Sequence, residues 1–176
     1  MERQPGSAGG IGPAYLQGFK TAAHYGADRI IQMDADGSHD PAQIPNLLKV
    51  EADLVIGSRW APGGSISGWP ISRHMLSKMA NWSTRKLILP GVRDSTSGFR
   101  AMTPELVHEI ARQEVTPRGF AFQVSNTLLA SKLGYSICEE PIHFRDRTLG
   151  ESKISINIVL ESGMWLLRTT WRQIFE

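Results

Sequence analysis

Two carboxylates one residue apart, Asp34 and Asp36, are the feature of this sequence whose residue types and spacing point most directly to chemistry. They follow a short apolar run at residues 30–33 that fits a buried strand. Side chains just past the end of such a strand lie at the edge of an α/β sheet where ligands bind. Two like charges there are unfavourable unless a cation offsets them, and carboxylate oxygens suit Mg²⁺ or Mn²⁺ together with substrate phosphates. A purely structural capping role is less favoured, because Asp40 before Pro41 already predicts the cap of the next helix.

A second chemistry for the same carboxylates stays open. An apolar strand followed by Asp34 and Asp36 also resembles the first motif of haloacid-dehalogenase-type phosphatases, in which the first aspartate attacks phosphorus and the second acts as acid and base. That family also needs a later acidic pair to hold its metal ion. Glu139 and Glu140 are not a convincing pair, because they directly precede Pro141 and are predicted to be strand-end surface.

Several basic residues complement the charge of these carboxylates. Arg59 ends the second predicted strand, so we expect it at the same sheet edge as Asp36. Arg73 begins a helix, and Arg147 and Lys153 lie together late in the chain. Guanidinium groups bind phosphates through paired hydrogen bonds, which are strong where water is excluded. We therefore expect Arg59 and Arg147, each inside a distinctive short motif, to act on an anionic substrate.

One α/β domain is predicted to position these groups. Apolar runs and turn residues predict alternating strands and helices, which is typical of a layered fold with a mainly parallel sheet. The strands are expected at residues 30–33, 53–56, 99–102, 136–138 and 142–144, and the helices at 13–25, 41–48, 73–87, 104–112 and 122–133. Residues 1–12 are expected to form an N-terminal loop, residues 13–153 the domain, and residues 154–176 a C-terminal helix. Cys138, inside an apolar strand, is predicted to be core.

Composition excludes several classes of protein. Hydrophobic residues make up 41% of the 176 residues and charged residues 20%, which excludes a disordered chain. The net charge of +2 is too balanced to predict a nucleic-acid partner. The single cysteine excludes an internal disulfide or a multi-cysteine zinc site and favours a reduced, cytoplasmic compartment. No apolar run approaches the ~18 residues that cross a bilayer, and the first residues lack the apolar stretch of a signal peptide.

The C-terminal helix carries an apolar stripe for which two interpretations stay open. The stripe recurs at helical spacing and consists of Leu160, Met164, Leu167, Trp171, Ile174 and Phe175. In one interpretation the helix packs on the sheet. In the other it lies in a membrane interface, with tryptophan at headgroup depth and Arg168 and Arg172 near lipid phosphates.

Four motifs together resemble those of the dolichol-phosphate (polyprenol-phosphate) mannosyltransferases, which are inverting glycosyltransferases of family 2 with a GT-A fold. They occur in the expected order at residues 33–39 (MDADGSH), 56–59 (IGSR), 94–100 (DSTSGFR) and 147–153 (RTLGESK). The resemblance covers nearly the whole chain from about residue 10 to residue 153. It implies a Rossmann-like three-layer fold and the transfer of mannose from GDP-mannose to a polyprenyl (dolichyl) phosphate.

The resemblance also implies roles for individual residues. Asp34, Asp36 and Ser38 would hold Mg²⁺ or Mn²⁺ on the donor's diphosphate, with Asp36 a catalytic residue. Arg59 and Arg147 would act as catalytic cations, and Asp34, Arg73 and Lys153 would bind the cofactor and the phosphates. No general base is needed, because the attacking phosphate is already ionised near neutral pH. The loop at residues 94–100 would shape the acceptor side, and the loop at residues 61–70 would close over the donor.

Two departures from the family pattern affect the expected function. The segment that normally forms the first strands and the nucleotide pocket is missing, so a partner supplying that half, or a non-catalytic remnant, stays open. Ser125 stands where many relatives carry a carboxylate. Because polyprenyl acceptors reside in lipid, the resemblance also implies a peripheral location at the cytoplasmic face of a membrane, which favours the interfacial interpretation of the C-terminal helix.

Overall fold

The computed structural model describes residues 11–113, 117, 120–146 and 156–175. Strands and helices alternate along most of the chain, as the hydrophobic pattern predicts. The helices are α1 (Ile11–His24), α2 (Ile44–Lys49), α3 (Ile71–Leu87), α4 (Pro104–Ala111), α5 (Phe120–Lys132) and α6 (Ile156–Phe175), and a 3₁₀ turn, η1 (Pro41–Gln43), precedes α2. The strands are β1 (Ile30–Gln32), β2 (Leu54–Ser58), β3 (Ser65–Ser67), β4 (Arg100–Met102), β5 (Ile137–Pro141) and β6 (His143–Arg145).

The main sheet has the strand order β1-β4-β2-β5 within the described residues. β2 and β5 are parallel, whereas β4 runs antiparallel to both β1 and β2. Three of the four strands therefore point the same way, in agreement with the mainly parallel sheet expected. β3 and β6 form a separate parallel pair.

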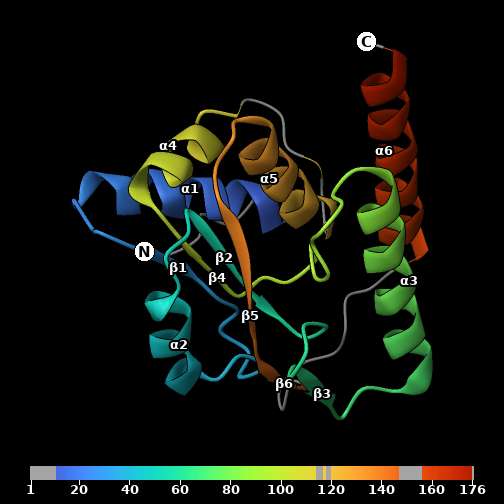
Figure 1. The fold of residues 1–176 in the computed structure, drawn as a ribbon, viewed down its shortest axis with the longest axis horizontal. Helices are drawn as coiled ribbons and strands as arrows, with labels where there is room; N and C mark the ends of the chain where they lie inside the picture. The colour runs from blue at the N-terminus through green and yellow to red at the C-terminus, as the bar shows by residue number, and fades with distance from the viewer. Residues whose placement is uncertain (1–10, 114–116, 118–119, 147–155, 176) are drawn as a thin grey trace, which may run out of the picture.

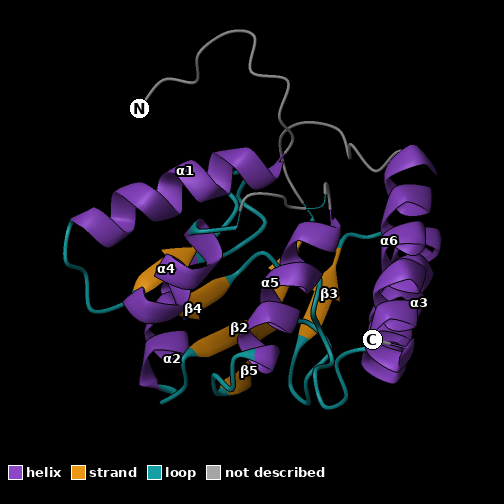
Figure 2. Ribbon diagram, turned by 90° about the horizontal axis from the view of Figure 1, so that it is seen from above, coloured by secondary structure: helices purple, strands orange, loops and turns teal. Residues whose placement is uncertain are grey.

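The sheet is the middle one of three layers (Figures 1 and 2). One face is covered by α1, α4 and α5, which pack on Ile30, Leu54, Ile56 and Met102. The other face carries Val55 and Ala101, which pack with Leu47 of α2. Alternate residues of each strand thus enter different cores, because successive side chains of a strand point to opposite faces. The three-layer α/β fold is confirmed.

The structure corrects three local expectations. α1 begins at Ile11, so residues 11–12 belong to this helix and not to the predicted loop. β3 forms inside the predicted loop 61–70, because β6 offers it an edge to pair with. Cys138 is exposed, because β5 is an edge strand of the main sheet as described.

The packing of α6 shows which of its faces is covered by the core. Trp165 and Leu166, on the side away from the predicted stripe, pack toward the core next to α5. The described members of the stripe face outward and are 53–66% exposed, namely Leu160, Met164, Leu167 and Trp171. No helix among the described residues has the length and apolar character that a membrane span requires.

Candidate functional site

Asp36 and Ser38 lie together in the turn that follows β1. The Ser38 backbone N–H donates to Asp36 Oδ1 over 3.0 Å, and the Ser38 hydroxyl donates to the same oxygen. Gly37 between them has φ +78°, a left-handed conformation that glycine adopts without a Cβ penalty. Asp36 is half-buried and Ser38 is buried. The turn therefore brings a carboxylate and a hydroxyl together.

Asp34 is held by a residue that the sequence did not mark as functional. The Tyr15 hydroxyl of α1 donates to Asp34 Oδ1 over 2.9 Å, and the Tyr15 ring stacks on Phe122 with a centroid distance of 5.9 Å. Burial and the neighbouring Asp34 carboxylate raise the pKa of Tyr15, so this hydroxyl stays a donor. Sequence periodicity assigned Tyr15 only to an apolar helix face, because nothing local to it signals a partner 19 residues away.

His39 lies among the charged groups of the site. Its ring is buried against Phe99 at 5.1 Å, and its Nδ1 accepts the backbone N–H of Asp34. Burial lowers the pKa of His39, which keeps the imidazole neutral. Its pKa responds to the charges of Asp34, Arg59, Asp36 and Asp94. Charged groups that follow β1 and β2, and one in the 94–100 loop, therefore act electrostatically on the same imidazole.

Arg59 is bound to the buried carboxylate of Asp94, which lies in the loop between α3 and β4. Its Nη2 and Nε donate to Asp94 at 2.7 and 2.8 Å, and its backbone N–H donates to the same carboxylate at 2.9 Å. Nη2 also donates to Thr96. The Asp94 side chain is 0% exposed and that of Arg59 is 9% exposed. The charge of Arg59 is thus largely compensated, and the guanidinium is held in one orientation.

Hydrogen bonds from α3 on one side and from β5 on the other hold the loop that carries Asp94. Asn81 of α3 donates to Thr96 Oγ1 over 3.0 Å and accepts the Thr96 N–H. On the other side, the Glu139 carboxylate accepts the backbone N–H groups of Arg93 and Asp94 at 2.9 and 2.8 Å. Glu139 was predicted to be strand-end surface, and that prediction is wrong: its side chain is 8% exposed because the loop covers it.

Arg100 stabilises the same loop through hydrogen bonds to its backbone carbonyls. It is fully buried, and it donates from Nε to the Ser97 carbonyl and from Nη2 to the Ser95 carbonyl. Burial lowers the pKa of Arg100 to about 10, so it remains cationic at neutral pH.

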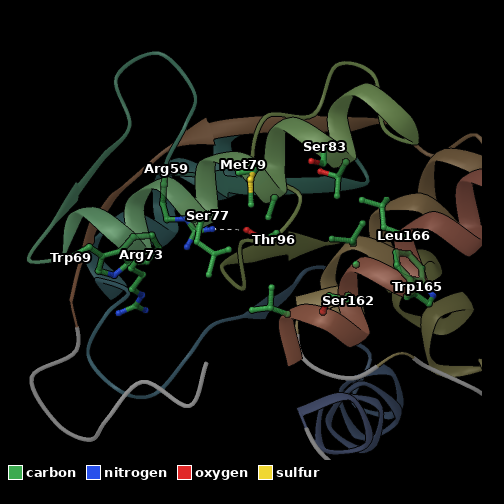
Figure 3. A pocket seen from close by; sticks show the side chains of 17 residues that line it. Arg59, Trp69, Arg73, Ser77, Met79, Ser83, Thr96, Ser162, Trp165 and Leu166 are labelled. Atoms are coloured by element: carbon green, nitrogen blue, oxygen red, sulfur yellow. Dashed lines mark hydrogen bonds between the residues drawn. The ribbon is translucent and has the colours of Figure 1, made fainter. Parts of the chain in front are cut away.

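Arg73, in the first turns of α3, lies close to Arg59 around one indole ring (Figure 3). The Arg73 guanidinium lies 4.2 Å from the Trp69 ring centroid and that of Arg59 lies 5.3 Å from it. Arg73 Nη1 also contacts Asp146 Oδ1 at 2.7 Å. Trp69 belongs to the loop expected to close over the donor. In the structure its indole ring contacts two arginines that are 14 residues apart in the sequence.

A cavity of about 260 Å³ opens beside these arginines (Figure 3). One end is polar, with Arg59, Arg73, Ser77 and Thr96. The remainder is lined by α3, α5 and α6. Most of its residues are apolar or small, namely Leu76, Met79, Ala80, Ala121, Val124, Val159, Gly163, Trp165 and Leu166, and the hydroxyl-bearing Ser83, Thr84 and Ser162 lie among them. The shape suits a molecule with an anionic head and a hydrocarbon tail.

The carboxylates also suit a divalent cation shared with a ligand. The described residues contain no group of three or more His, Cys, Asp or Glu side chains that could hold a metal ion by themselves. Asp34, Asp36 and the Ser38 hydroxyl provide a smaller set of hard oxygen donors. Mg²⁺ and Mn²⁺ commonly bind to one or two carboxylates and complete their shell with water and substrate phosphates, so this donor set fits. Arg147 and Lys153 lie outside the described residues.

Comparisons with known proteins show curated relatives of this chain. No family model matches the chain. The chain is 41% identical over 168 residues to undecaprenyl-phosphate mannosyltransferase of Micrococcus luteus, covering 92% of this chain and 69% of that protein. It is 42% identical over 159 residues to polyprenol monophosphomannose synthase of Mycolicibacterium smegmatis, covering 89% of this chain and 60% of that protein.

Solved structures show the same fold at lower identity. Glucosyl-3-phosphoglycerate synthase from Mycobacterium tuberculosis, in complex with Mn²⁺, UDP and glucosyl-3-phosphoglycerate, matches with a TM-score of 0.62 and 18% identity over 92% of this chain. The same enzyme with phosphoglyceric acid matches with a TM-score of 0.60 and 17% identity over 97% of this chain. This chain spans about half the length of those solved chains, at 55% and 56%.

Proposed function

Because this chain belongs to the polyprenyl-phosphate mannosyltransferase family of glycosyltransferases and has their GT-A fold, we propose that it transfers mannose from GDP-mannose to a polyprenyl phosphate. The observation that carries the proposal is the cavity with Arg59 and Arg73 at one end and apolar helix surfaces along the rest. A polyprenyl phosphate has the same two-part character. The phosphate would lie at the arginines, with Ser77 and Thr96 as further donors, and the proximal part of the prenyl chain would lie between α3 and α6.

The proposed reaction needs placement of charge and no general base. A phosphate oxygen of the acceptor attacks the anomeric carbon of mannose and forms a new C–O bond. The bond from that carbon to the diphosphate oxygen breaks, GDP leaves with the electron pair, and the configuration at the carbon inverts. The attacking phosphate is mostly dianionic at neutral pH, because its second pKa is about 6. Arg59 and Arg73 would hold it against the repulsion of the donor's diphosphate.

Asp34, Asp36 and Ser38 are the residues that would hold Mg²⁺ or Mn²⁺. When bound, the ion would supply positive charge to the departing diphosphate. In this chain, the Tyr15 hydroxyl orients Asp34, and the turn at Gly37 orients Asp36 and Ser38. Arg147 and Lys153 are proposed as additional cations for the phosphates.

The guanine-binding part is proposed to come from a segment or partner outside this chain. The chain spans 60–69% of the length of the two relatives, so part of each relative has no counterpart in it. β1 is an edge strand of the described sheet and is the place where further strands would continue it.

A membrane surface is proposed as the place where the chain meets its acceptor, at the cytoplasmic face. α3 and α6 lie side by side (Figure 1) and line the cavity together. Both leave large apolar side chains exposed. On α3, Met75, Met79 and Trp82 are 66%, 59% and 62% exposed. On α6, the outward stripe is accompanied by Arg168 and Arg172, which suit anionic headgroups.

Binding to lipid vesicles tests the membrane part. Trp82→Ser should reduce co-sedimentation with phosphatidylglycerol-containing vesicles, because it removes an exposed indole from the docking face. Tyr25→Ser is the matched control, since Tyr25 is 79% exposed but lies just past the end of α1, on the other side of the molecule. Equal loss in both variants, or none in either, would contradict docking by this face.

Transfer of radiolabelled mannose from GDP-mannose to polyprenyl phosphate tests the activity. We expect transfer that needs a divalent cation and is abolished in Asp36→Ala, whereas Asp28→Ala, at an exposed position, leaves it unchanged. Transfer unaffected by Asp36→Ala would refute the role of the carboxylates. If the chain alone is inactive and does not bind GDP-mannose with Mn²⁺, the unmatched part of the Micrococcus luteus relative is added. Restored transfer would then indicate a missing pocket, and continued inactivity a non-catalytic remnant. Hydrolysis of simple phosphomonoesters, lost in Asp34→Asn, would instead support the phosphatase alternative.

A further inference from the structure

β6 has hydrogen-bonding partners along both of its edges. Its pairing with β3 continues past its end, where the Asp146 N–H donates to the Ser67 carbonyl over 2.8 Å. On the other edge, the Arg145 N–H donates to the Ser38 carbonyl over 3.3 Å. Backbone groups of successive strand residues point to alternate edges, so this N–H faces away from β3. The turn with Asp36 and Ser38 therefore lies along the edge of β6 that β3 leaves open.

A side-chain amide bonds to the same edge of β6. Gln43 Nε2 donates to the His143 carbonyl over 3.1 Å, and Gln43 Oε1 accepts the His143 backbone N–H over 2.7 Å. The amide thus bonds to both backbone groups of one strand residue, as the opposite residue of a neighbouring antiparallel strand would. The two residues are 100 positions apart in the sequence.

The segment between Ser38 and Gln43 is short and bonded within itself. Asp40 Oδ1 accepts the Ala42 N–H over 2.9 Å, and the Asp40 carbonyl accepts the Gln43 N–H over 3.0 Å. Pro41, the first residue of η1, has a φ that its ring fixes. Because few torsions between them are free, movement of Gln43 relative to β6 moves the turn as well.

β6 is a firm support for this turn because its middle residue is buried. Phe144 is 6% exposed, and its ring lies 5.3 Å from the His39 ring and 5.3 Å from the Trp69 ring. His39 follows the turn directly, and Trp69 lies at the arginine end of the cavity. The strand therefore packs between the carboxylate turn and the proposed acceptor site.

We propose that Gln43 is a positioning residue for the divalent cation, because it holds the turn of Asp36 and Ser38 on β6. This inference rests on the proposed cation site. Oxygen donors bind a small cation well only where their directions are fixed, and the groups behind the ligands fix them. Without the amide, the turn keeps the bond between Arg145 and Ser38, which is long and therefore weak, and it gains freedom to move away from β6.

Binding of Mn²⁺ alone to the full chain, measured by the electron paramagnetic resonance of free Mn²⁺, tests the inference. Gln43→Met keeps nearly the length and volume of the side chain but removes both hydrogen bonds. It should weaken Mn²⁺ binding on the order of fivefold, less than the roughly 10–100-fold caused by losing a direct partner of a ligand. The urea midpoint should change little, because Leu47 is fully buried and keeps α2 on the sheet. Gln43→Asn keeps an amide that is one methylene too short to reach β6, and it should show the same loss.

Two control variants separate the clamp from its surroundings. His143→Ala removes the imidazole that contacts Ser65 but keeps the backbone groups that Gln43 binds, so its Mn²⁺ affinity should equal that of wild type. Gln17→Met repeats the substitution at an exposed position of α1 and should also leave the affinity unchanged.

Wild-type affinity for Mn²⁺ in both Gln43 variants would overturn the role of Gln43 and leave the cation site standing. A loss that His143→Ala or Gln17→Met shares equally would overturn it as well. No binding of Mn²⁺ by the wild-type chain would overturn the cation site and this inference together.

Discussion

Asp94→Asn should be among the most destabilising isosteric substitutions in this chain. Asparagine has nearly the shape of aspartate but removes the charge that Arg59 faces. The Asp94 carboxylate accepts hydrogen bonds from Arg59 Nε and Nη2 and from the Asn81 amide. In the variant, the asparagine NH₂ group would face at least one of these donors and could not accept its hydrogen bond. The variant therefore leaves a guanidinium that is 9% exposed without its counter-charge.

The expected magnitude follows from burial. Removing one partner of a buried ion pair costs about 3–5 kcal/mol. We take the lower end, because Thr96 still accepts from Arg59, and expect a loss of about 3 kcal/mol in the free energy of unfolding. For a domain of this size that loss lowers Tm by roughly 6–12 °C. The half-exposed Arg73–Asp146 pair provides the comparison, and Asp146→Asn should cost less than about 1 kcal/mol.

Urea unfolding followed by circular dichroism measures both variants under the same conditions. Arg59→Met combined with Asp94→Asn should recover part of the loss, because the uncompensated charge is then removed as well. A cost for Asp94→Asn no larger than that for Asp146→Asn would refute the argument that burial of the pair holds Arg59 in place.

Three further predictions concern other parts of the chain. Gly18→Ala lies at an exposed position inside α1 where a Cβ meets nothing within 4 Å, and it should raise the free energy of unfolding in urea by about 0.5–1 kcal/mol. A lower free energy of unfolding would contradict this expectation. Hydrogen bonds from Ser136 hold the pKa of Asp53 below its usual value near 3.8, so its stabilising effect is present above that pH and is lost as the pH falls through the folded pKa. Urea midpoints of Asp53→Asn and wild type should therefore differ at pH 6 and converge near pH 2, and a constant difference would contradict this. Tyr15→Phe should weaken Mn²⁺ binding, measured by the electron paramagnetic resonance of free Mn²⁺, on the order of tenfold, because Asp34 loses its orienting donor; unchanged affinity would remove Tyr15 from the site.

The sheet edge was predictable because it depends on order along the chain. Apolar runs mark β1 and β2, and same-direction strands of one sheet end at the same edge, so Asp36 and Arg59 were expected at one edge, following two strands that β4 separates. The reversed direction of β4 was not predictable in the same way. Its three residues carry no signal of direction, which depends on how the preceding α3 and loop return to the sheet.

The partners of the site residues were not predictable, because they are set by tertiary approach. Asp94 meets Arg59 across 35 residues, and Asp146 meets Arg73 across 73 residues. Local pattern could show only that each is an acidic residue in a polar stretch. Periodicity likewise showed an apolar stripe on α6, but the core is contacted by Trp165 and Leu166 instead. A stripe states which side chains share a face, and only the packing shows whether that face is covered.

α3 explains how an exposed apolar surface and a buried polar network belong to one site. Asn81 and Thr84, on its inner side, are buried and bind the loop that carries Asp94, while Met79 and Trp82 on its outer side are exposed. Residues three or four apart share a face of a helix, and here the intervening residues occupy the opposite one. In the proposed docking on a membrane, a rigid helix that would contact lipid on one side and the arginine-holding loop on the other would keep the cavity mouth at a constant depth below the membrane surface. An acceptor whose phosphate stays at headgroup level would then reach Arg73 without leaving the bilayer, and no helix among the described residues would have to span the membrane.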